Sequence, residues 1–391
     1  MNKLGENVNE TDLQKELDIN AGEGKTLVTD NYDETLNILF HDTKHNFTVE
    51  DDNISYMGII PDAPADAVAR INTTFYPSLQ EAINAVADNK RTTIVLLKDI
   101  SENVTIAQSK NVVLNLSGYT VKNLSDSSII TLNGILAIKN GKIEGYYNDA
   151  VATIKVNPNA EINLSNTNVS RDSEDEYLKE TIELHGTLKI NSGKIENTNS
   201  CAIWSYTDSN VNMEISGTAE IYSSAIGRVT LYNNTTGTTK ITGGKVMSEN
   251  SNAIRQEGVL EISGTAEIGG TSSSKPTIGT YSGSKTTITG GTITSTGSNV
   301  INNFGELEIS GTAEISGTSS SKPTIATDSG SKTTITGGII KSTKSYAFYN
   351  KSGGTAIITG GTFISTNSYA IFNSGTISVN GATINGMTYG I

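Results

Sequence analysis

The sequence predicts an all-β solenoid, in which short strands stack coil upon coil, and three observations carry that prediction. The first is a repeated segment: MEISGTAEI at 213–221 returns as LEISGTAEI at 260–268 and at 307–315, 47 residues apart each time. The second is a half-period, since TITGGII at 334–340 is followed only 23 residues later by IITGGTF at 357–363. The third is composition, because 38 Gly and only 6 Pro among 391 residues are typical of many short strands joined by tight turns.

Apolar residues recur in three ladders with a period of about 24 residues. Polar and apolar residues alternate within each segment, as in Thr287-Ile288-Thr289, so one face of each strand is buried. We therefore predict a right-handed parallel β-helix over 101–391, with three strands per coil and about twelve coils. A second ladder runs from Ile143 to Ile384. The first ladder contains Ile138, Ile162, Ile190, Ile215, Ile241, Ile262, Ile288, Ile309, Ile335, Ile358 and Val379, and the third contains Ile203, Ile226, Ile254, Ile278, Ile301, Ile325, Phe348 and Ile371.

The first 70 residues break this period and predict a small β-rich segment. Residues 25–29, 35–40 and 47–49 have the composition of short strands.

Residues 71–100 predict a capping helix and the first strand of the solenoid. The helix is expected over 78–88, where Ser78 and Glu81 form a capping box and the apolar residues share one face. Residues 93–97 then form the first strand. Such a helix would cover the open end of the solenoid, which otherwise exposes unpaired strand edges.

Charge narrows the possible functions. Residues 1–100 hold 18 acidic and 8 basic side chains, whereas residues 101–391 hold 23 and 20. A chain with a net charge of −13 lacks the basic footprint of a nucleic-acid-binding protein and the polybasic segment of a membrane-surface protein. No apolar run is long enough to span a membrane, and no secretory signal is evident. We expect an extracellular or cell-surface protein whose signal and anchor are not in this chain.

Twelve residues of the segment 69–121 form a pattern of a helix, a strand and a turn: Tyr76, Ser78, Leu79, Ala82, Ile83, Leu96, Leu97, Asp99, Ile100, Asn115, Leu116 and Gly118. This segment resembles the opening of secreted and surface right-handed β-helix proteins of Gram-positive and gut bacteria, which have a pectate-lyase-like fold. Together with the Ile-Thr-Gly-Gly-Thr coils, the resemblance covers roughly 69–391. It implies the fold and a surface setting but no activity, since the acidic calcium cluster of the related enzymes has no counterpart that we can place.

One column of residues directly after the third ladder is the best candidate binding site. Alternation points it outward, and exposed aromatic rings beside Arg and Asn would suit a sugar. The alternative is that these residues only shield a corner. The column contains Trp204, Gly227, Arg255, Gly279, Asn302, Ala326, Tyr349 and Phe372, of which Trp204, Arg255, Asn302, Tyr349 and Phe372 are the candidate ligand-binding residues.

Other chemistry-bearing groups give weaker signals. The acidic residues of 171–176 suit calcium or an acid–base pair, but a solvated loop explains them equally well. His41 and His45 would share a metal only on a helix, whereas their neighbours predict strand and turn. The single cysteine, Cys201, permits no internal disulfide and has no histidine near it in the sequence. We therefore predict no catalytic residue, metal site or cofactor.

The function predicted is a non-catalytic adhesin-type module, a rigid β-helix that binds glycan or acts as a spacer. The expected partner is a polysaccharide or host glycan, with no nucleic acid and no membrane insertion. Two alternatives stay open: a polysaccharide lyase or hydrolase on the same scaffold, and a phage tail fibre or spike.

Overall fold

A computed structural model describes most of the chain, in two compact units. It describes residues 35–40, 43–50, 53–60, 62–147, 151–173, 178–207, 211–233 and 237–387. Unit 1 consists of residues up to 100 with 109–120 and 136–141, and unit 2 consists of 101–108, 121–135 and 142–391. No helix in the described residues is long and apolar enough to cross a membrane.

Unit 1 begins with an antiparallel sheet of three strands, β1 (Thr35–Phe40), β2 (Thr43–Glu50) and β3 (Asn53–Ile60). The strands predicted at 35–40 and 47–49 are confirmed, and β3 is an addition to them. The strand predicted at 25–29 lies outside the described residues.

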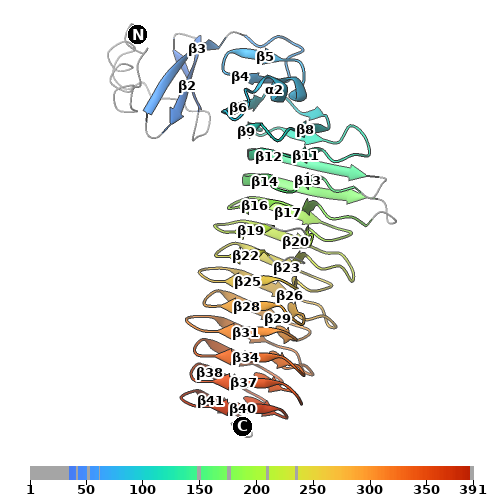
Figure 1. Cartoon of the computed structure of the whole chain (residues 1–391), viewed down its shortest axis with the longest axis vertical. Coiled ribbons are helices and arrows are strands. Elements are labelled where there is room, and N and C mark those ends of the chain that lie inside the picture. The colour runs from blue at the N-terminus through green and yellow to red at the C-terminus, as the bar shows by residue number, and fades with distance from the viewer. Residues whose placement is uncertain are drawn as a thin grey trace. The chain divides into compact units, whose positions relative to one another are not determined.

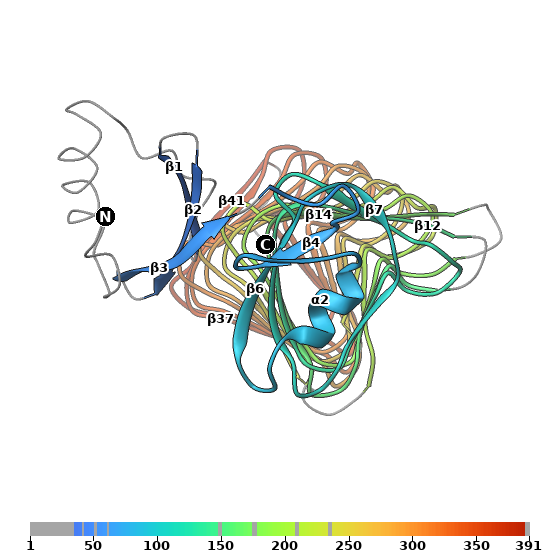
Figure 2. The same ribbon diagram turned by 90° about the horizontal axis from the view of Figure 1, so that it is seen from above.

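The predicted helix is also present in unit 1, as α2 (Leu79–Ala85). The Ser78 hydroxyl accepts a hydrogen bond from the backbone N–H of Glu81 at 3.1 Å, which confirms the N-cap. The helix ends three residues earlier than predicted, because Val86 has extended backbone. Its buried face packs on β4, β5 and β6, as Figure 2 shows for β4 and β6. These strands and the next one of unit 1 are β4 (Ala69–Ile71), β5 (Thr74–Tyr76), β6 (Arg91–Leu96) and β9 (Asn111–Asn115).

Unit 2 is a parallel β-solenoid, and the chain forms about 12 turns (Figure 1). Each regular coil contributes two strands to a 26-stranded sheet and one to a 12-stranded sheet. The strands of the first ladder are β14 (Glu161–Ser173), β16 (Thr187–Ile190), β19 (Asn212–Ile215), β22 (Thr238–Ile241), β25 (Val259–Ile262), β28 (Lys285–Ile288), β31 (Glu306–Ile309), β34 (Lys332–Ile335), β37 (Thr355–Ile358) and β40 (Thr376–Val379). Those of the second are the end of β14, then β17 (Lys194–Asn197), β20 (Glu220–Ser223), β23 (Lys245–Ser248), β26 (Glu267–Gly270), β29 (Thr292–Ser295), β32 (Glu314–Gly317), β35 (Ile339–Ser342), β38 (Thr362–Ser365) and β41 (Thr383–Gly386).

The 12-stranded sheet holds the third ladder. It consists of β8 (Val104–Ile106), β11 (Ile130–Leu132), β13 (Ile154–Val156), β15 (Ile182–Leu184), β18 (Ile203–Ser205), β21 (Leu231–Asn233), β24 (Ile254–Gln256), β27 (Ile278–Thr280), β30 (Ile301–Asn303), β33 (Ile325–Thr327), β36 (Phe348–Asn350) and β39 (Ile371–Asn373). The 26-stranded sheet also contains β7 (Ile100–Ser101), β10 (Thr120–Lys122) and β12 (Ile135–Tyr147), and β12 carries Ile138 of the first ladder and Ile143 of the second.

The strand registers confirm most of the predicted ladders. The first ladder pairs in register from Ile190 to Val379, and the second from Ile195 to Ile384. Ile162 was wrongly aligned, since it pairs with Leu188, and Leu164 is the residue beside Ile190. Because equivalent residues of successive coils pair in register, the β-branched side chains of each ladder lie next to one another along the core.

Ser-Gly and Gly-Gly pairs form the turns after the first-ladder strands, and Gly264 shows why glycine is needed there. Its φ is +61°, and a Cβ atom at this position would lie 2.3 Å from the carbonyl oxygen of Thr242 in the coil below. A residue with a side chain would be strained at this positive φ, and its Cβ atom would clash with the carbonyl oxygen, so only glycine fits well.

A buried polar ladder, which sequence reasoning missed, runs along the ends of the third-ladder strands. Asn233 and Asn350 have no exposed surface. The amide of Asn233 donates to Gln256 at 2.8 Å, and that of Asn350 donates to Asn373 at 2.8 Å. The amide nitrogens of Asn233 and Asn350 thus bond to the equivalent residue of the next coil, whereas Gln256 Nε2 and Asn350 Oδ1 are buried without a hydrogen-bond partner among the described residues.

Candidate functional site

The outward face of the 12-stranded sheet carries the predicted column, with one correction. The prediction placed Ile226 in the third ladder and Gly227 in the column. Instead, Leu231 pairs with Ile203 and Ile254, whereas Ile226 is 88% exposed. The loops before β19 and before β21 are both longer than those of the neighbouring coils, so the strand residue lies five residues later than predicted. The outward column is therefore Thr105, Thr131, Lys155, Glu183, Trp204, Tyr232, Arg255, Gly279, Asn302, Ala326, Tyr349 and Phe372.

This correction changes the site, because a tyrosine replaces a glycine between Trp204 and Arg255. The Trp204 ring contacts the Tyr232 ring edge-on, with centroids 4.0 Å apart. The Arg255 guanidinium lies over Tyr232 at 4.8 Å and over Tyr281 at 4.5 Å. We call these four residues and Tyr206, whose ring is 6.1 Å from Trp204, the Trp204 cluster. Cation–π contacts of this kind hold the rings in fixed positions.

The Trp204 cluster includes one buried ring, Tyr232, which forms a small apolar core with Cys201 and Val229, and Trp204 packs against this core. The Cys201 side chain is buried, and burial raises the pKa of its thiol to about 12. A thiol in this environment stays protonated at neutral pH and supports the rings above it.

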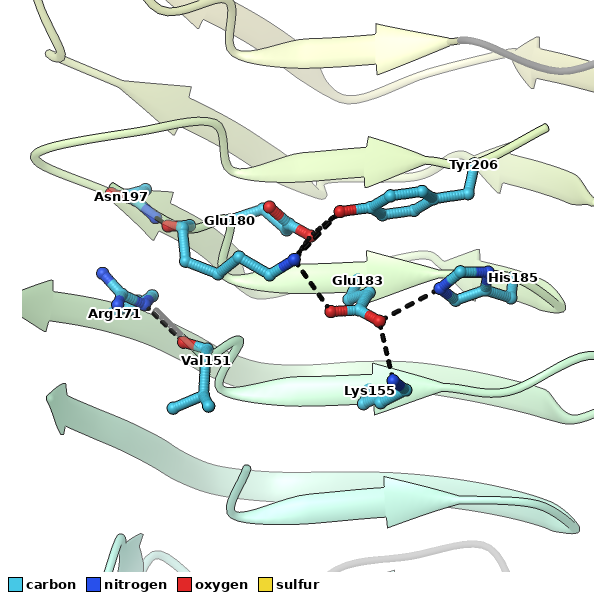
Figure 3. Close-up of polar contacts among 9 residues, drawn as sticks. Val151, Lys155, Arg171, Glu180, Glu183, His185, Asn197 and Tyr206 are labelled. Atoms are coloured by element: carbon cyan, nitrogen blue, oxygen red, sulfur yellow. Dashed lines mark hydrogen bonds and ion pairs between the residues drawn. The ribbon is translucent and has the colours of Figure 1, made fainter. Parts of the chain in front are cut away.

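A charged network adjoins the Trp204 cluster and centres on Glu183 (Figure 3). The Glu183 carboxylate binds the ammonium groups of Lys155 and Lys179, each at 3.0 Å, and the Nε2 atom of His185 at 3.0 Å. Burial by itself would raise the pKa of Glu183, but these hydrogen bonds outweigh burial and lower the pKa to about 2. Glu183 is therefore an anion at neutral pH.

The second carboxylate of the network, Glu180, binds the same ammonium. Lys179 Nζ lies 3.1 Å from Glu180 Oε1 and donates to the Tyr206 hydroxyl at 2.9 Å. That hydroxyl donates to Glu180 at 2.9 Å, and the Tyr206 ring stacks on His185 at 4.5 Å. Burial raises the pKa of Tyr206 to about 12, so its hydroxyl keeps its proton. The ammonium groups of Lys155 and Lys179 balance the carboxylates of Glu180 and Glu183, so the network is suited to stabilise the neighbouring rings.

A second group of rings forms around Tyr349, near the other end of the column. Tyr346 stacks on Phe372 at 4.8 Å, and Tyr349 lies 5.2 Å from Phe372. Tyr369 lies 5.9 Å from Phe372. These four residues, the Tyr349 cluster, are all partly exposed.

The stretch of the column between the two clusters carries no large side chain. It consists of Gly279, Asn302 and Ala326, and Ala326 is buried. The Asn302 Oδ1 atom is buried without a hydrogen-bond partner among the described residues. The structure therefore brings Trp204 together with Arg255, and Tyr349 with Phe372, whereas Asn302 contacts neither cluster through any ring or charge.

The other predicted groups add no site. Of the acidic segment, Glu174, Asp175 and Glu176 lie outside the described residues, and Arg171 is fully buried with its guanidinium over the Tyr147 ring at 5.2 Å. His41 also lies outside the described residues. In the part of the chain that the structure describes, no three His, Cys, Asp or Glu side chains are arranged to hold a metal.

Sequence reasoning missed Lys155, Glu183 and Tyr232 as members of the column. The signal was present, because Glu183 alternates with the apolar residues Ile182 and Leu184 and must therefore point outward. Lys179 and Tyr206 lie in loops beyond the strand ends, where alternation predicts nothing.

The resemblance to surface β-helix proteins of Gram-positive and gut bacteria stays a prediction. No protein-family model, no curated protein and no solved structure matches this chain.

Proposed function

We propose that this chain is a non-catalytic, adhesin-type module of the bacterial surface that binds glycan on the outward column, with the solenoid as a rigid scaffold. One observation carries the proposal: two clusters of aromatic rings, all at least partly exposed except Tyr232, gather on the same face of one sheet. Ring faces bind the apolar faces of sugars, and the adjoining Arg255 and Tyr hydroxyls supply hydrogen bonds.

The charged network supports a binding role over catalysis. A glycoside hydrolase needs one protonated carboxyl as general acid and one free carboxylate. Glu183 has a pKa of about 2 and three cationic or imidazole partners, so it is a poor proton donor at neutral pH. Glu180 shares one of these partners, Lys179.

A polysaccharide lyase or hydrolase is the alternative, favoured by the proximity of those two carboxylates. Because both bind the Nζ atom of Lys179, they lie on one side of the sheet beside the rings. Glu183→Gln would abolish such an activity.

The test is to incubate the protein with bacterial, plant and mucin polysaccharides, and to measure both bound protein and released oligosaccharide. We expect binding without release, and a loss of about fivefold or more in affinity for Trp204→Ala and for Tyr349→Ala, since one ring contact contributes about 1 kcal/mol or more. Tyr119→Ala, which removes an exposed ring in unit 1, is the control. Unchanged binding by both cluster variants would disprove the site, and released fragments would favour the enzyme.

A further inference from the structure

A row of lysines borders the outward column on the side where the second-ladder strands end. Lys275 lies in the loop from β26 to β27, Lys322 in the loop from β32 to β33, and Lys344 in the loop from β35 to β36. All three side chains are exposed. We call them the lysine edge. The first two loops have the same sequence, TSSSKPT, two coils apart.

No carboxylate balances the lysine edge. The five loops from β26 to β39 on this side of the coils contain no Asp or Glu. None of the three lysines forms an ion pair within the described part of the chain. By contrast, the cations beside the rings are paired: Arg255 with Glu257 at 2.7 Å, and Lys351 with Asp328 at 2.8 Å. The lysine edge therefore leaves a local surplus of positive charge on an otherwise acidic protein.

These loops lie directly beside the column. A Cβ atom at Gly279 would lie 3.5 Å from Cγ of Pro276, the neighbour of Lys275. Tyr346, in the same loop as Lys344, stacks on Phe372 of the column. A ligand that covers the column from Gly279 to Phe372 therefore passes along the lysines.

We propose that the ligand of this face is a linear glycan that carries negative groups, with its sugar rings on the Tyr349 cluster and its carboxylates or sulfates on the lysine edge. This inference rests on the proposed function and names the class of ligand. Neighbouring coils are about 4.8 Å apart, so Lys275 and Lys322, two coils apart, lie roughly 10 Å apart, and Lys344 lies one coil further along. A nucleic-acid strand carries one phosphate about every 3.4 Å, which is denser than three lysines over three coil spacings, so the row suits a polymer with more widely spaced charges better.

The experiment compares the protein with K275S/K322S/K344S. Serine is a suitable replacement because Ser298 holds the corresponding place in the loop from β29 to β30: its N–H donates to Ser295, as that of Lys322 donates to Ser319. The matched control, K240S/K285S/K332S, removes the same charge from strands of the first ladder. Probes are hyaluronate for carboxylates, dextran sulfate for sulfates, neutral dextran and single-stranded oligothymidylate.

We expect the lysine-edge variant to bind hyaluronate or dextran sulfate about tenfold more weakly at low salt, and the control variant to bind as the parent does. The salt dependence of binding should also flatten, because fewer ions are released. Equal anionic binding by parent and lysine-edge variant, with loss only in Tyr349→Ala, overturns this inference and leaves the proposed function standing. Binding of no glycan at all defeats the proposed function. Tight, lysine-dependent binding of oligothymidylate overturns the inference in favour of nucleic acid.

Discussion

The two ring clusters lie on the same sheet, but the protein holds them in place by different means. The Trp204 cluster rests on a network of partly buried charges, in which Glu183 alone has three polar partners. The Tyr349 cluster lies on regular coils, where Phe348 and Phe363 fill the core with ring centroids 6.1 Å apart. Among the described residues, the ion pair beside this cluster is that of Lys351 with Asp328. Regular repeats stabilise a solenoid by stacking equal apolar residues, and a coil that departs from the repeat needs specific polar contacts instead.

The largest expected effect tests whether apolar packing stabilises the coils that carry the Tyr349 cluster. Phe363→Ala should lower the free energy of unfolding by about 3–5 kcal/mol, because the ring is fully buried and leaves a cavity. The loss should not depend on salt. Urea unfolding followed by circular dichroism measures it, and Phe304→Ala, at a ring that is 44% exposed, should cost less than about 1 kcal/mol. A loss that shrinks in high salt would show that charge also supports the regular coils.

A smaller effect is expected when the charged network beside the Trp204 cluster is broken. Lys179→Ala leaves Glu180 and Glu183 without their shared ammonium and should cost about 2 kcal/mol, less than a fully buried pair because Lys179 is partly exposed. Fluorescence of Trp204, the single tryptophan, reports this region directly. Lys245→Ala removes an exposed pair with Glu267 and should change stability by no more than about 0.5 kcal/mol. Equal losses for both variants would contradict the difference drawn between the clusters.

The last expected effect concerns the pH dependence of stability. The pKa of Glu183 is lowered from 4.5 to about 2 in the folded protein, so its stabilising contribution is complete above the unfolded value and is lost as the pH falls toward about 2. Glu183→Gln should therefore flatten the acid limb of stability measured through Trp204 fluorescence. Glu267→Gln, at an exposed pair, should leave that limb unchanged. A Glu183 variant with the parent's acid limb would show that another group controls it.

Sequence periodicity predicted the fold and most core residues but only part of the candidate site. The ladder from Ile190 to Val379 was readable because each coil repeats the same spacing. Ile226 was misplaced because the spacing alone cannot tell which of two apolar residues, Ile226 or Leu231, belongs in a coil with a longer loop. The Lys179–Glu180–Tyr206 contacts join loops of different coils, so they depend on three-dimensional stacking that no local pattern encodes.

The repeat unit of 47 residues, which is two coils long, also means that the distance between the two clusters can change only in steps of whole coils. Because Glu261 and Glu308 stand at equivalent places in successive repeats, a gene that gained or lost one such unit would keep every ladder in register. The Tyr349 cluster would then move by two coil spacings, roughly 10 Å, relative to the Trp204 cluster. The number of coils between the two clusters thus sets the distance between them, and duplication of one DNA segment is enough to change that distance.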